Sequence, residues 1–385
     1  MRGPNLVFIA GEASGDALAA TVMERIRERA PGAQFSGIAG PAMRARGCAA
    51  WASTEDLSVI GLAEVVGELP RLLRLRRRIG NRIVRTRPDL LMTVDSPDFN
   101  LALARRARRA GIPTIQLVCP SVWAWRQSRT RRLRRDFDHV LCLYPFEQSF
   151  LDRRGVPASF IGHPLADTLQ PDFDREALRN QLGIADDAPA LALLPGSRAG
   201  EIDRVGPVLL RAARALRLRH RGLQLLTAAC SRETRKHFYR LRDRIAPELT
   251  FRRAETAATA LRAADAGLAT SGTVTLEALL CQCPIAIAYR MHPLSVLLLR
   301  DLRLYKRNYF ALPNLLAGER LVPEFLQGAA SPDALADAVA PWLARPAKAD
   351  DIRQRYRRIH DRLRRGAAEK AATRALRIAG AGDGR

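Results

Sequence analysis

The chain has 385 residues, of which 47% are hydrophobic, and this length exceeds what one ordinary core can organise, so two domains are expected. Its formal net charge is +24, from 63 Lys and Arg against 39 Asp and Glu, yet Lys occupies only positions 236, 306, 348 and 370. Such a preference for Arg indicates a compositional bias, so the charge alone does not identify a nucleic-acid-binding protein. An aromatic content of 6% and the lack of a recognisable nucleic-acid-reading module argue against nucleic acid as a partner.

The cysteine pattern and the apolar runs exclude further classes of protein. The six cysteines are scattered and form no pair of Cys-x-x-Cys units, so a reducing, cytoplasmic setting without a zinc site is expected. The apolar run at residues 6–10 is too short for a secretory signal, and no apolar stretch approaches the length of a membrane span. An integral membrane protein is therefore not expected.

Strand-like and helix-like segments alternate through the first half of the chain. Helical patterns follow most of the strands, and the longest covers residues 67–86. The strand patterns lie at residues 5–10, 34–39, 89–94, 113–119 and 139–143. Continuous apolar strands in repeated βα units are typical of a parallel sheet with helices on both faces. The first half therefore predicts one doubly wound α/β domain, which we set at residues 1–168.

The pattern pauses at residues 162–174, which carry two prolines and several acidic residues, and we place a hinge there. Further strand patterns then lie at residues 190–194, 224–228, 249–251, 266–269 and 284–288. We set a second Rossmann-like domain at residues 169–345 and a charged helical tail at 346–385, which could pack back on the first domain. The expected fold is thus two Rossmann-like doubly wound domains that face a central cleft at the carboxyl ends of their strands.

Two small-residue turns in the second half each follow an apolar strand and open a helix-like segment. They read Leu-Pro-Gly-Ser-Arg-Ala-Gly-Glu at residues 194–201 and Ser-Gly-Thr-Val-Thr-Leu-Glu at residues 271–277. Backbone N–H groups at a helix N-terminus, with Arg198 beside them, suit a diphosphate, and Glu277 suits ribose hydroxyls. Glu201 has the alternative role of complementing the helix dipole, and Glu277 that of a surface helix residue. The turns predict a protein that handles a nucleotide-activated substrate.

Carboxylates follow two strands of the first half. Glu12 lies in a Gly-flanked loop, where it either faces a ligand or belongs to a helix start that Ser14 and Asp16 cap. Asp95 and Asp98 come just after the strand at 89–94. One of these two fits a helix cap, and the other fits a general base, because strand carboxyl ends face the ligand crevice in this fold. The pattern leaves these alternatives open.

Two Trp residues stand close together in the segment Pro-Ser-Val-Trp-Ala-Trp-Arg at residues 120–126, directly after a strand and before a basic helix. A packed corner between domains is one interpretation of Trp123. A wall for a sugar ring or an acyl chain is the other, and Arg126 would then lie beside the same substrate.

An apolar stripe over residues 57–75 lies beside a dense group of Arg residues. Such a stripe is either core or a face that docks at the membrane interface, and the periodicity does not decide between them. The residues assigned to membrane or acyl contact are Val59, Ile60, Leu62, Val66, Leu69, Leu72 and Leu73.

Six motifs occur in order and with consistent spacing over nearly the whole chain. They are Gly-Glu-Ala-Ser-Gly-Asp (11–16), Asp-Ser-Pro-Asp-Phe-Asn (95–100), Pro-Ser-Val-Trp-Ala-Trp-Arg (120–126), Leu-Pro-Gly-Ser-Arg (194–198), Ser-Gly-Thr-Val-Thr-Leu-Glu (271–277) and Leu-Pro-Asn-Leu-Leu-Ala-Gly (312–318). The Trp-Ala-Trp and Pro-Asn-Leu-Leu segments are the most specific of them. Together the motifs resemble those of the lipid-A-disaccharide synthase family.

The resemblance implies an inverting GT-B glycosyltransferase that joins UDP-2,3-diacylglucosamine to 2,3-diacylglucosamine 1-phosphate, giving the β-1,6-linked disaccharide 1-phosphate and UDP. It points to Asp95 as the general base, with Glu12 as a second candidate or as a residue that positions the acceptor. No cofactor and no metal are expected, because an Arg and helix N-termini already oppose the diphosphate. The residues assigned to substrate binding are Gly196, Ser197, Arg198, Glu201, Ser271, Gly272, Thr273, Glu277, Asn314, Asp98, Trp123 and Arg126.

The resemblance also implies a location, because the family is associated with the inner face of the cytoplasmic membrane. We therefore expect a cytoplasmic protein that is peripherally bound to the inner membrane, and the long helices at the chain's end leave room for a homodimer. The nearest rival is another GT-B UDP-sugar enzyme, either a peptidoglycan N-acetylglucosaminyltransferase or a UDP-sugar epimerase. A rival from a different class is a non-catalytic basic protein that binds nucleic acid or membrane.

Overall fold

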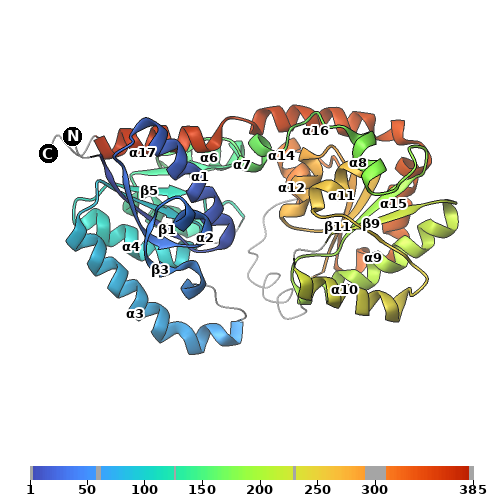
Figure 1. Ribbon diagram of the computed structural model, residues 1–385, viewed down its shortest axis with the longest axis horizontal. Coiled ribbons are helices and arrows are strands. Elements are labelled where there is room, and N and C mark those ends of the chain that lie inside the picture. Colours follow the sequence, from blue (N-terminus) through green and yellow to red (C-terminus); the bar gives the residue numbers. More distant parts are fainter. Residues whose placement is uncertain (1–2, 58–61, 125–126, 229–230, 291–308, 381–385) are drawn as a thin grey trace. The chain divides into compact units, whose positions relative to one another are not determined.

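The computed structural model describes residues 3–57, 62–124, 127–228, 231–290 and 309–380. The chain divides into two compact units, which are described separately (Figure 1). Unit 1 comprises Met1–Asp167 and Leu363–Arg385, and unit 2 comprises Thr168–Arg362. The chain therefore leaves unit 1, builds unit 2 and returns to unit 1 at its end.

Unit 1 contains a seven-stranded parallel sheet in the order β3-β2-β1-β4-β5-β6-β7. Its strands are β1 (Asn5–Ala10), β2 (Gln34–Ala39), β3 (Ala49–Ser53), β4 (Leu90–Val94), β5 (Thr114–Leu117), β6 (His139–Cys142) and β7 (Ala158–Phe160). Its helices are α1 (Ala13–Arg29), α2 (Pro41–Ala45), α3 (Leu62–Thr86), α4 (Pro97–Arg109), α5 (Thr130–Asp136), α6 (Pro145–Asp152) and α17 (Ala367–Gly380), with α7 (Pro164–Thr168) at the boundary. The strand order reverses direction between β1 and β4, which makes this pair the switch point of the sheet.

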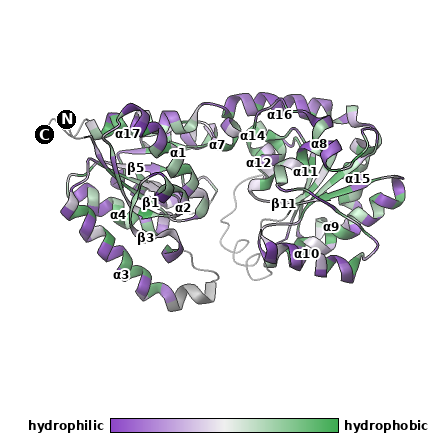
Figure 2. Cartoon of the chain, viewed as in Figure 1, coloured by the Kyte–Doolittle hydropathy of each residue, from purple (hydrophilic) through white to green (hydrophobic). Residues whose placement is uncertain are grey.

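The sheet of unit 1 is buried on both faces. Leu6 and Phe8 of β1 pack in one core with α1 and α17, whereas Val7 and Ile9 pack in another core with α3 and α4. Because successive strand side chains point to opposite faces, a strand covered on both sides must be apolar at every position. Helix α17 packs directly against α1 (Figure 1). Hydrophobic residues recur among hydrophilic ones along α3 and α9 (Ala199–Arg219) (Figure 2). This pattern is typical of a helix that turns one apolar face toward a core.

Unit 2 repeats the plan with a six-stranded sheet, in which the described pairs are parallel, in the order β10-β9-β8-β11-β12-β13. Its strands are β8 (Ala190–Leu194), β9 (Gln224–Thr227), β10 (Arg252–Arg253), β11 (Ala266–Thr270), β12 (Ile285–Tyr289) and β13 (Glu324–Leu326). Its helices are α8 (Arg175–Gln181), α9, α10 (Arg232–Ile245), α11 (Ala257–Ala263), α12 (Thr273–Leu280), α14 (Leu312–Ala317), α15 (Pro332–Ala344) and α16 (Asp350–Leu363). Here the order reverses between β8 and β11. Residues 249–251, where a strand was expected, are not in a strand, and the two-residue β10 follows directly after them.

Short 3-10 turns complete the described secondary structure. They are η1 (Thr54–Leu57), η2 (Gln127–Arg129), η3 (Gln327–Ala329) and η4 (Pro346–Ala349). Two doubly wound parallel-sheet units confirm the predicted fold class. Of the helices that the structure describes, none combines the length and the apolar character that crossing a membrane would need.

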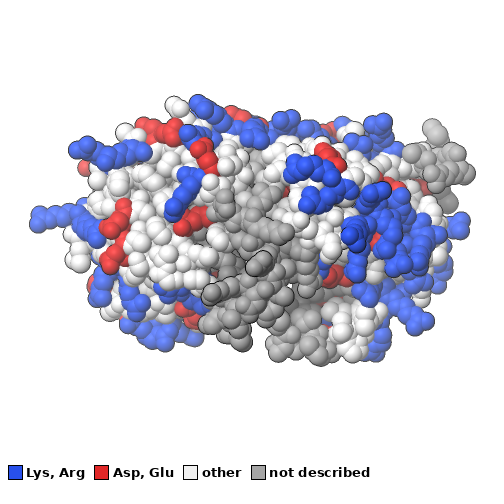
Figure 3. Space-filling view, turned by 180° about the vertical axis from the view of Figure 1, so that it is seen from behind, with Lys and Arg blue, Asp and Glu red and all other residues white. Residues whose placement is uncertain are grey.

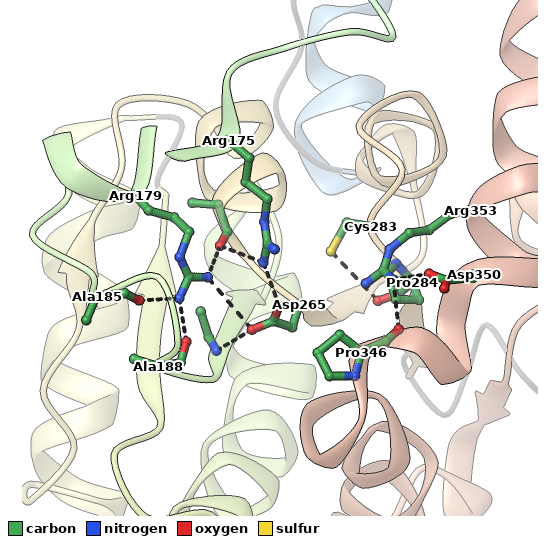
Figure 4. Close-up of polar contacts among 12 residues, drawn as sticks. Arg175, Arg179, Ala185, Ala188, Asp265, Cys283, Pro284, Pro346, Asp350 and Arg353 are labelled. Atoms are coloured by element: carbon green, nitrogen blue, oxygen red, sulfur yellow. Dashed lines mark hydrogen bonds and ion pairs between the residues drawn. The ribbon is translucent and has the colours of Figure 1, made fainter. Parts of the chain in front are cut away.

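A buried ion pair closes the amino-terminal edge of the sheet in unit 2 (Figure 4). Asp265, just before β11, accepts a hydrogen bond from the backbone N–H of Ala190 at 2.8 Å and pairs with Arg175 and Arg179. The Arg179 side chain is 2% exposed and also donates to the carbonyl oxygen of Ala263 at 2.9 Å. This cluster lies at the strand ends opposite to the glycine-rich turns, so it has a structural role.

Candidate functional site

The loops after β1 and β4 lie against each other at the switch point of unit 1. A Cβ atom placed on Gly11 would lie 1.8 Å from Oγ of Ser96, and one on Gly15 would lie 2.7 Å from Oδ2 of Asp95. Both distances are shorter than real Cβ contacts, so a side chain at either position would have to displace the Ser96 or Asp95 side chain that faces it. The loop after β4 is therefore pressed onto the start of α1, where open α/β sheets bind their ligands.

Asp95 and Ser96 have left-handed backbone conformations, with φ of 53° and 37°. Non-glycine residues with such conformations cost about 1–3 kcal/mol each, and they concentrate at functional sites. Ser96 immediately precedes α4 and therefore occupies the N-cap position, so neither Asp95 nor Asp98 is the N-cap residue. The Ser96 side chain makes no capping hydrogen bond. The turn is instead closed by the N–H of Phe99, which donates to the carbonyl oxygen of Ser96 at 3.1 Å.

In the loops after β1 and β4, Asp95 is the carboxylate whose pKa is clearly shifted. Burial raises the pKa of Asp95 to about 6, and the negative charge of Glu12 adds to the increase. Glu12 itself is exposed and immediately precedes α1, without a capping hydrogen bond from its side chain. A carboxyl group with a pKa near the working pH is suited to accept a proton during a reaction.

The Asp16 side chain does not cap the helix that contains it, contrary to one of the two interpretations of this loop. Its carboxylate is 2% exposed and accepts hydrogen bonds from the N–H groups of Gly40 at 2.7 Å, Ala42 at 2.8 Å and Met43 at 3.2 Å. These groups form the start of α2, so Asp16 caps a helix that follows the neighbouring strand β2. Its role is structural.

A cavity of about 350 Å³ opens beside the loop after β4. Asp95, Asp98, Cys119 and Val122 are among the residues that line it. Asp98 is exposed and forms an ion pair with Arg129, which lines the same cavity. The cavity thus brings together the two acidic residues of the 95–100 motif and a cation suited to an anionic group.

Trp123 packs against the core that contains Val122, and its indole N–H donates a hydrogen bond to the buried Glu147. The Trp123 Nε1–H donates to Oε1 of Glu147 at 3.3 Å, and its ring packs edge-to-face on Phe146 with the centroids 5.0 Å apart. Glu147 also accepts from the N–H groups of Leu143 and Tyr144, both at 3.1 Å, and burial raises its pKa to about 8. The sequence analysis missed Glu147, although a Glu at the third position of a helix that starts with Pro is a recognised capping pattern. Arg126 lies outside the described residues.

Cys119, Cys142 and Glu147 are the one group of potential metal ligands found in the described segments, with ligand atoms within 4.8 Å of one another. A hydrogen bond with the Cys142 thiol, together with burial, raises the pKa of Cys119 far above its ordinary value, which opposes the thiolate form that a metal needs. The Glu147 oxygens already accept three hydrogen bonds. This group therefore fits a packed structural role better than a metal site.

The turn after β8 in unit 2 has the form expected of an anion-binding turn. Gly196 has φ of 125°, and a Cβ there would lie 2.8 Å from Glu201, so the turn needs glycine at this point. Glu201 reaches back and accepts from the N–H of Ser197 at 3.1 Å, while Nη1 of Arg198 lies 3.5 Å from its Oε1. The Arg198 side chain is 80% exposed at the start of α9, so it is available to an incoming anion.

The turn after β11 lies on the neighbouring strand. Gly272 has φ of 145°, precedes α12, and has open space where a side chain would stand. Gly272 and Thr273 are exposed and Ser271 is half-buried, so their backbone groups border solvent at a helix start. Burial raises the pKa of Glu277, which is half-buried one turn further along the helix. The two turns flank the switch point of unit 2, as the loops of Asp95 and Glu12 flank that of unit 1.

Asn314 is fully buried, and its side chain is occupied within unit 2. Its amide nitrogen donates to the carbonyl oxygen of Val322 at 2.9 Å and to Glu324, and its oxygen accepts from the N–H groups of Leu321 and Val322 at 2.8 Å. These contacts tie α14 to the segment before β13. Any effect of Asn314 on a ligand would therefore act through the position of this segment.

The predicted membrane residues divide between described and undescribed positions. Val59, Ile60 and the side chains of Leu62 and Val66 lie outside the described structure. Leu69 and Leu73 are 49% and 43% exposed, and Leu72 is half-buried, whereas α3 turns its later apolar residues into the core. Basic side chains crowd the face of unit 1 that is seen at the right of Figure 3. The exposed arginines of α3 to α5 include Arg74, Arg77, Arg78, Arg105, Arg109, Arg131 and Arg132.

Comparison with known proteins adds independent information on the whole chain. Residues 6–378 match the family model described as lipid-A-disaccharide synthetase. The lipid-A-disaccharide synthases of Enterobacter sp. (strain 638) and Escherichia coli O8 (strain IAI1) are 42% and 41% identical over 379 residues, covering 98% of this chain and 99% of each relative.

Solved structures with the same fold are more distant in sequence. A UDP-GlcNAc 2-epimerase from Neisseria meningitidis bound to UDP-GlcNAc has a TM-score of 0.63 at 10% identity, covering 97% of this chain and 98% of that one. A glycosyltransferase from Rickettsia africae has a TM-score of 0.59 at 11% identity, with coverage of 99% and 98%. At these identities the likeness establishes the two-domain fold alone.

Proposed function

Because the chain belongs to the lipid-A-disaccharide synthase family, whose members are glycosyltransferases, we propose that it joins UDP-2,3-diacylglucosamine to 2,3-diacylglucosamine 1-phosphate. The products are the β-1,6-linked disaccharide 1-phosphate and UDP. Unit 1 takes the acceptor and unit 2 takes the UDP-sugar. The observation that carries the assignment of roles is Asp95, a carboxylate with a raised pKa in a left-handed turn that lines a cavity.

The reaction first requires a base that removes the proton of the acceptor hydroxyl group. The 6-hydroxyl of the acceptor attacks the anomeric carbon from the face opposite UDP, so a C–O bond forms while the bond to UDP breaks and the configuration inverts. Asp95 accepts the hydroxyl proton as the new bond forms. Glu12 assists through its charge, which helps to raise the pKa of Asp95, and it is the second candidate for the base. Asp98, Trp123 and Arg126 contribute to the acceptor's surroundings.

The departing UDP is the second requirement, because negative charge develops on its phosphate. Arg198 is exposed at a helix start and can pair with the diphosphate, as can the N–H groups of Ser271 to Thr273 at the start of α12. The N–H of Ser197 becomes available to a phosphate oxygen if Glu201 turns away. Glu277 accepts hydrogen bonds from the ribose hydroxyls, and Asn314 supports the nucleotide by holding the segment before β13.

We also propose that the protein binds peripherally to the inner membrane from the cytoplasmic side. Its acceptor carries acyl chains, and the exposed Leu69 and Leu73 lie on α3, which also carries the exposed Arg74, Arg77 and Arg78. Apolar side chains beside clustered positive charge suit an interface with anionic lipid.

The test is an assay of the purified protein with both substrates in detergent micelles, following UDP and the tetraacyl disaccharide. The wild-type protein should form the disaccharide, Asp95→Asn should form almost none, and the exposed Asp361→Asn should match the wild type. Full activity of Asp95→Asn would move the base to Glu12 or Asp98. Conversion of the UDP-sugar without an acceptor would indicate an epimerase instead.

A further inference from the structure

A buried amide lies directly behind the turn that carries Asp95. The Asn100 side chain is 0% exposed, and its Nδ2 donates to the carbonyl oxygens of Val94 at 3.2 Å and Asp95 at 2.8 Å. Because both neighbours are acceptors, the NH₂ group and not the oxygen must face them. Gln116 on β5 adds a longer contact of 3.4 Å from its Nε2 to the same Asp95 oxygen. Two side-chain amides therefore hold the backbone of one residue.

The position of Asn100 is unfavourable for stability alone. Its Oδ1 is buried and has no hydrogen-bond partner among the described residues, although it lies in a well-packed helix. The backbone that it holds is left-handed at two successive non-glycine residues, Asp95 and Ser96. An unpaired buried oxygen and a strained turn both favour unfolding, and such features persist where function requires them.

The held turn determines where the carboxylate of Asp95 lies. Its Oδ2 lies 2.7 Å from the position that a Cβ of Gly15 would take, so the group is packed against the first turn of α1 and near Glu12. The shorter of the two Asn100 hydrogen bonds goes to the backbone carbonyl oxygen of Asp95. Release of that carbonyl lets the turn relax toward ordinary backbone angles, which moves the carboxylate away from α1.

We propose that Asn100 is a positioning residue for the reaction: its amide holds the β4–α4 turn in the left-handed conformation that places the Asp95 carboxylate in the cavity. The inference rests on the proposed role of Asp95 as the general base. Asn100 itself does not touch the substrate, so its effect passes entirely through Asp95.

The test compares Asn100→Leu, which keeps the size but removes the donor, with Asn180→Leu on the exposed surface of α8. We expect kcat of Asn100→Leu to fall on the order of 100-fold, as for a reacting group misplaced by about 1 Å, with KM nearly unchanged. The thermal midpoint should change little, because removal of the unpaired oxygen and relief of the strained turn offset the hydrogen bonds that the Val94 and Asp95 carbonyl oxygens lose. The acidic limb of the kcat profile should move from about pH 6 toward lower pH, because the released carboxyl is less buried.

A second pair of variants separates positioning from a general structural role and guards against a misfolded single variant. Adding Asn100→Leu to Asp95→Asn should cause no further loss of kcat, because no base is left to position. Gln116→Met removes the longer contact to Asp95, together with hydrogen bonds to the carbonyl oxygens of Leu117 and Val118 and from Thr93. It should lower kcat less than Asn100→Leu does and shift the acidic limb in the same direction. A further loss in the double variant, or wild-type kcat and pH profile in Asn100→Leu, would overturn the proposal. An active Asp95→Asn would instead overturn the base assignment on which it rests.

Discussion

Gly15→Ala isolates the contact between the loop of Asp95 and helix α1. Gly15 is a helical residue, and alanine favours a helix over glycine by up to about 1 kcal/mol. The new methyl group would lie 2.7 Å from Oδ2 of Asp95 and 3.2 Å from Cγ1 of Val94. The conflict therefore falls mainly on the movable end of one side chain, and the fold should tolerate it.

The size of the effect follows from the distance. Ordinary contact begins near 3.4 Å, so the carboxylate must move by about 0.7 Å. Since a displacement of about 1 Å lowers the rate on the order of 100-fold, we expect kcat to fall between about 10- and 100-fold. The free energy of unfolding should stay within about 1 kcal/mol of wild type, because helix propensity offsets the residual strain.

The assay measures kcat and KM with both substrates in micelles, together with urea unfolding of the same preparations. The control is Gly80→Ala in α3, where the added Cβ meets the flexible Cδ of Arg106 at 3.0 Å. Wild-type kcat in a folded Gly15→Ala protein would refute the reasoning, because the carboxylate position would then not matter. Loss of folding would refute the claim that the side chain can move aside.

Four further predictions concern the base, the donor, the membrane and the fold. Burial raises the pKa of Asp95 from 3.8 to about 6, so ionisation of this carboxyl group lowers the stability of the protein as the pH rises through this window. Asp95→Asn should therefore raise the thermal midpoint at about pH 7 and not at about pH 4. An equal shift at both pH values would contradict this reasoning. Arg198→Ala should lower kcat/KM for the UDP-sugar on the order of 100-fold with an unchanged thermal midpoint, whereas an unchanged kcat/KM would remove Arg198 from the donor site. Exchanging both Leu69 and Leu73 for Ser should weaken sedimentation with anionic vesicles while activity on micellar substrates persists, and unchanged sedimentation would argue against this docking surface. Arg179→Met should lower the free energy of unfolding by about 3 kcal/mol in urea titrations, since it leaves the buried Asp265 with one cation, and a loss below about 1 kcal/mol would contradict the buried ion pair.

Local sequence determined the layers of this protein. Apolar runs such as residues 5–10 and 190–194 are strands because both of their faces are covered, and the glycine-rich turns follow them directly. Strand and helix periods, and the glycines that end a strand, are properties of a few consecutive residues. The short β3, β7 and β13 were not predicted, because three to five residues at a sheet edge carry little pattern.

Tertiary structure alone decided which of the predicted residues act together. Strand order makes β1 and β4 neighbours, so Asp95 is buried and lies near the charge of Glu12, and both effects raise the pKa of Asp95. No local pattern contains that order. The partners of buried polar groups are equally remote in sequence: Asp16 caps the helix after the next strand, and Glu147 holds Trp123. A polar side chain reveals its type in the sequence, but whether it is buried, paired or free depends on backbone groups that only folding brings within hydrogen-bonding distance.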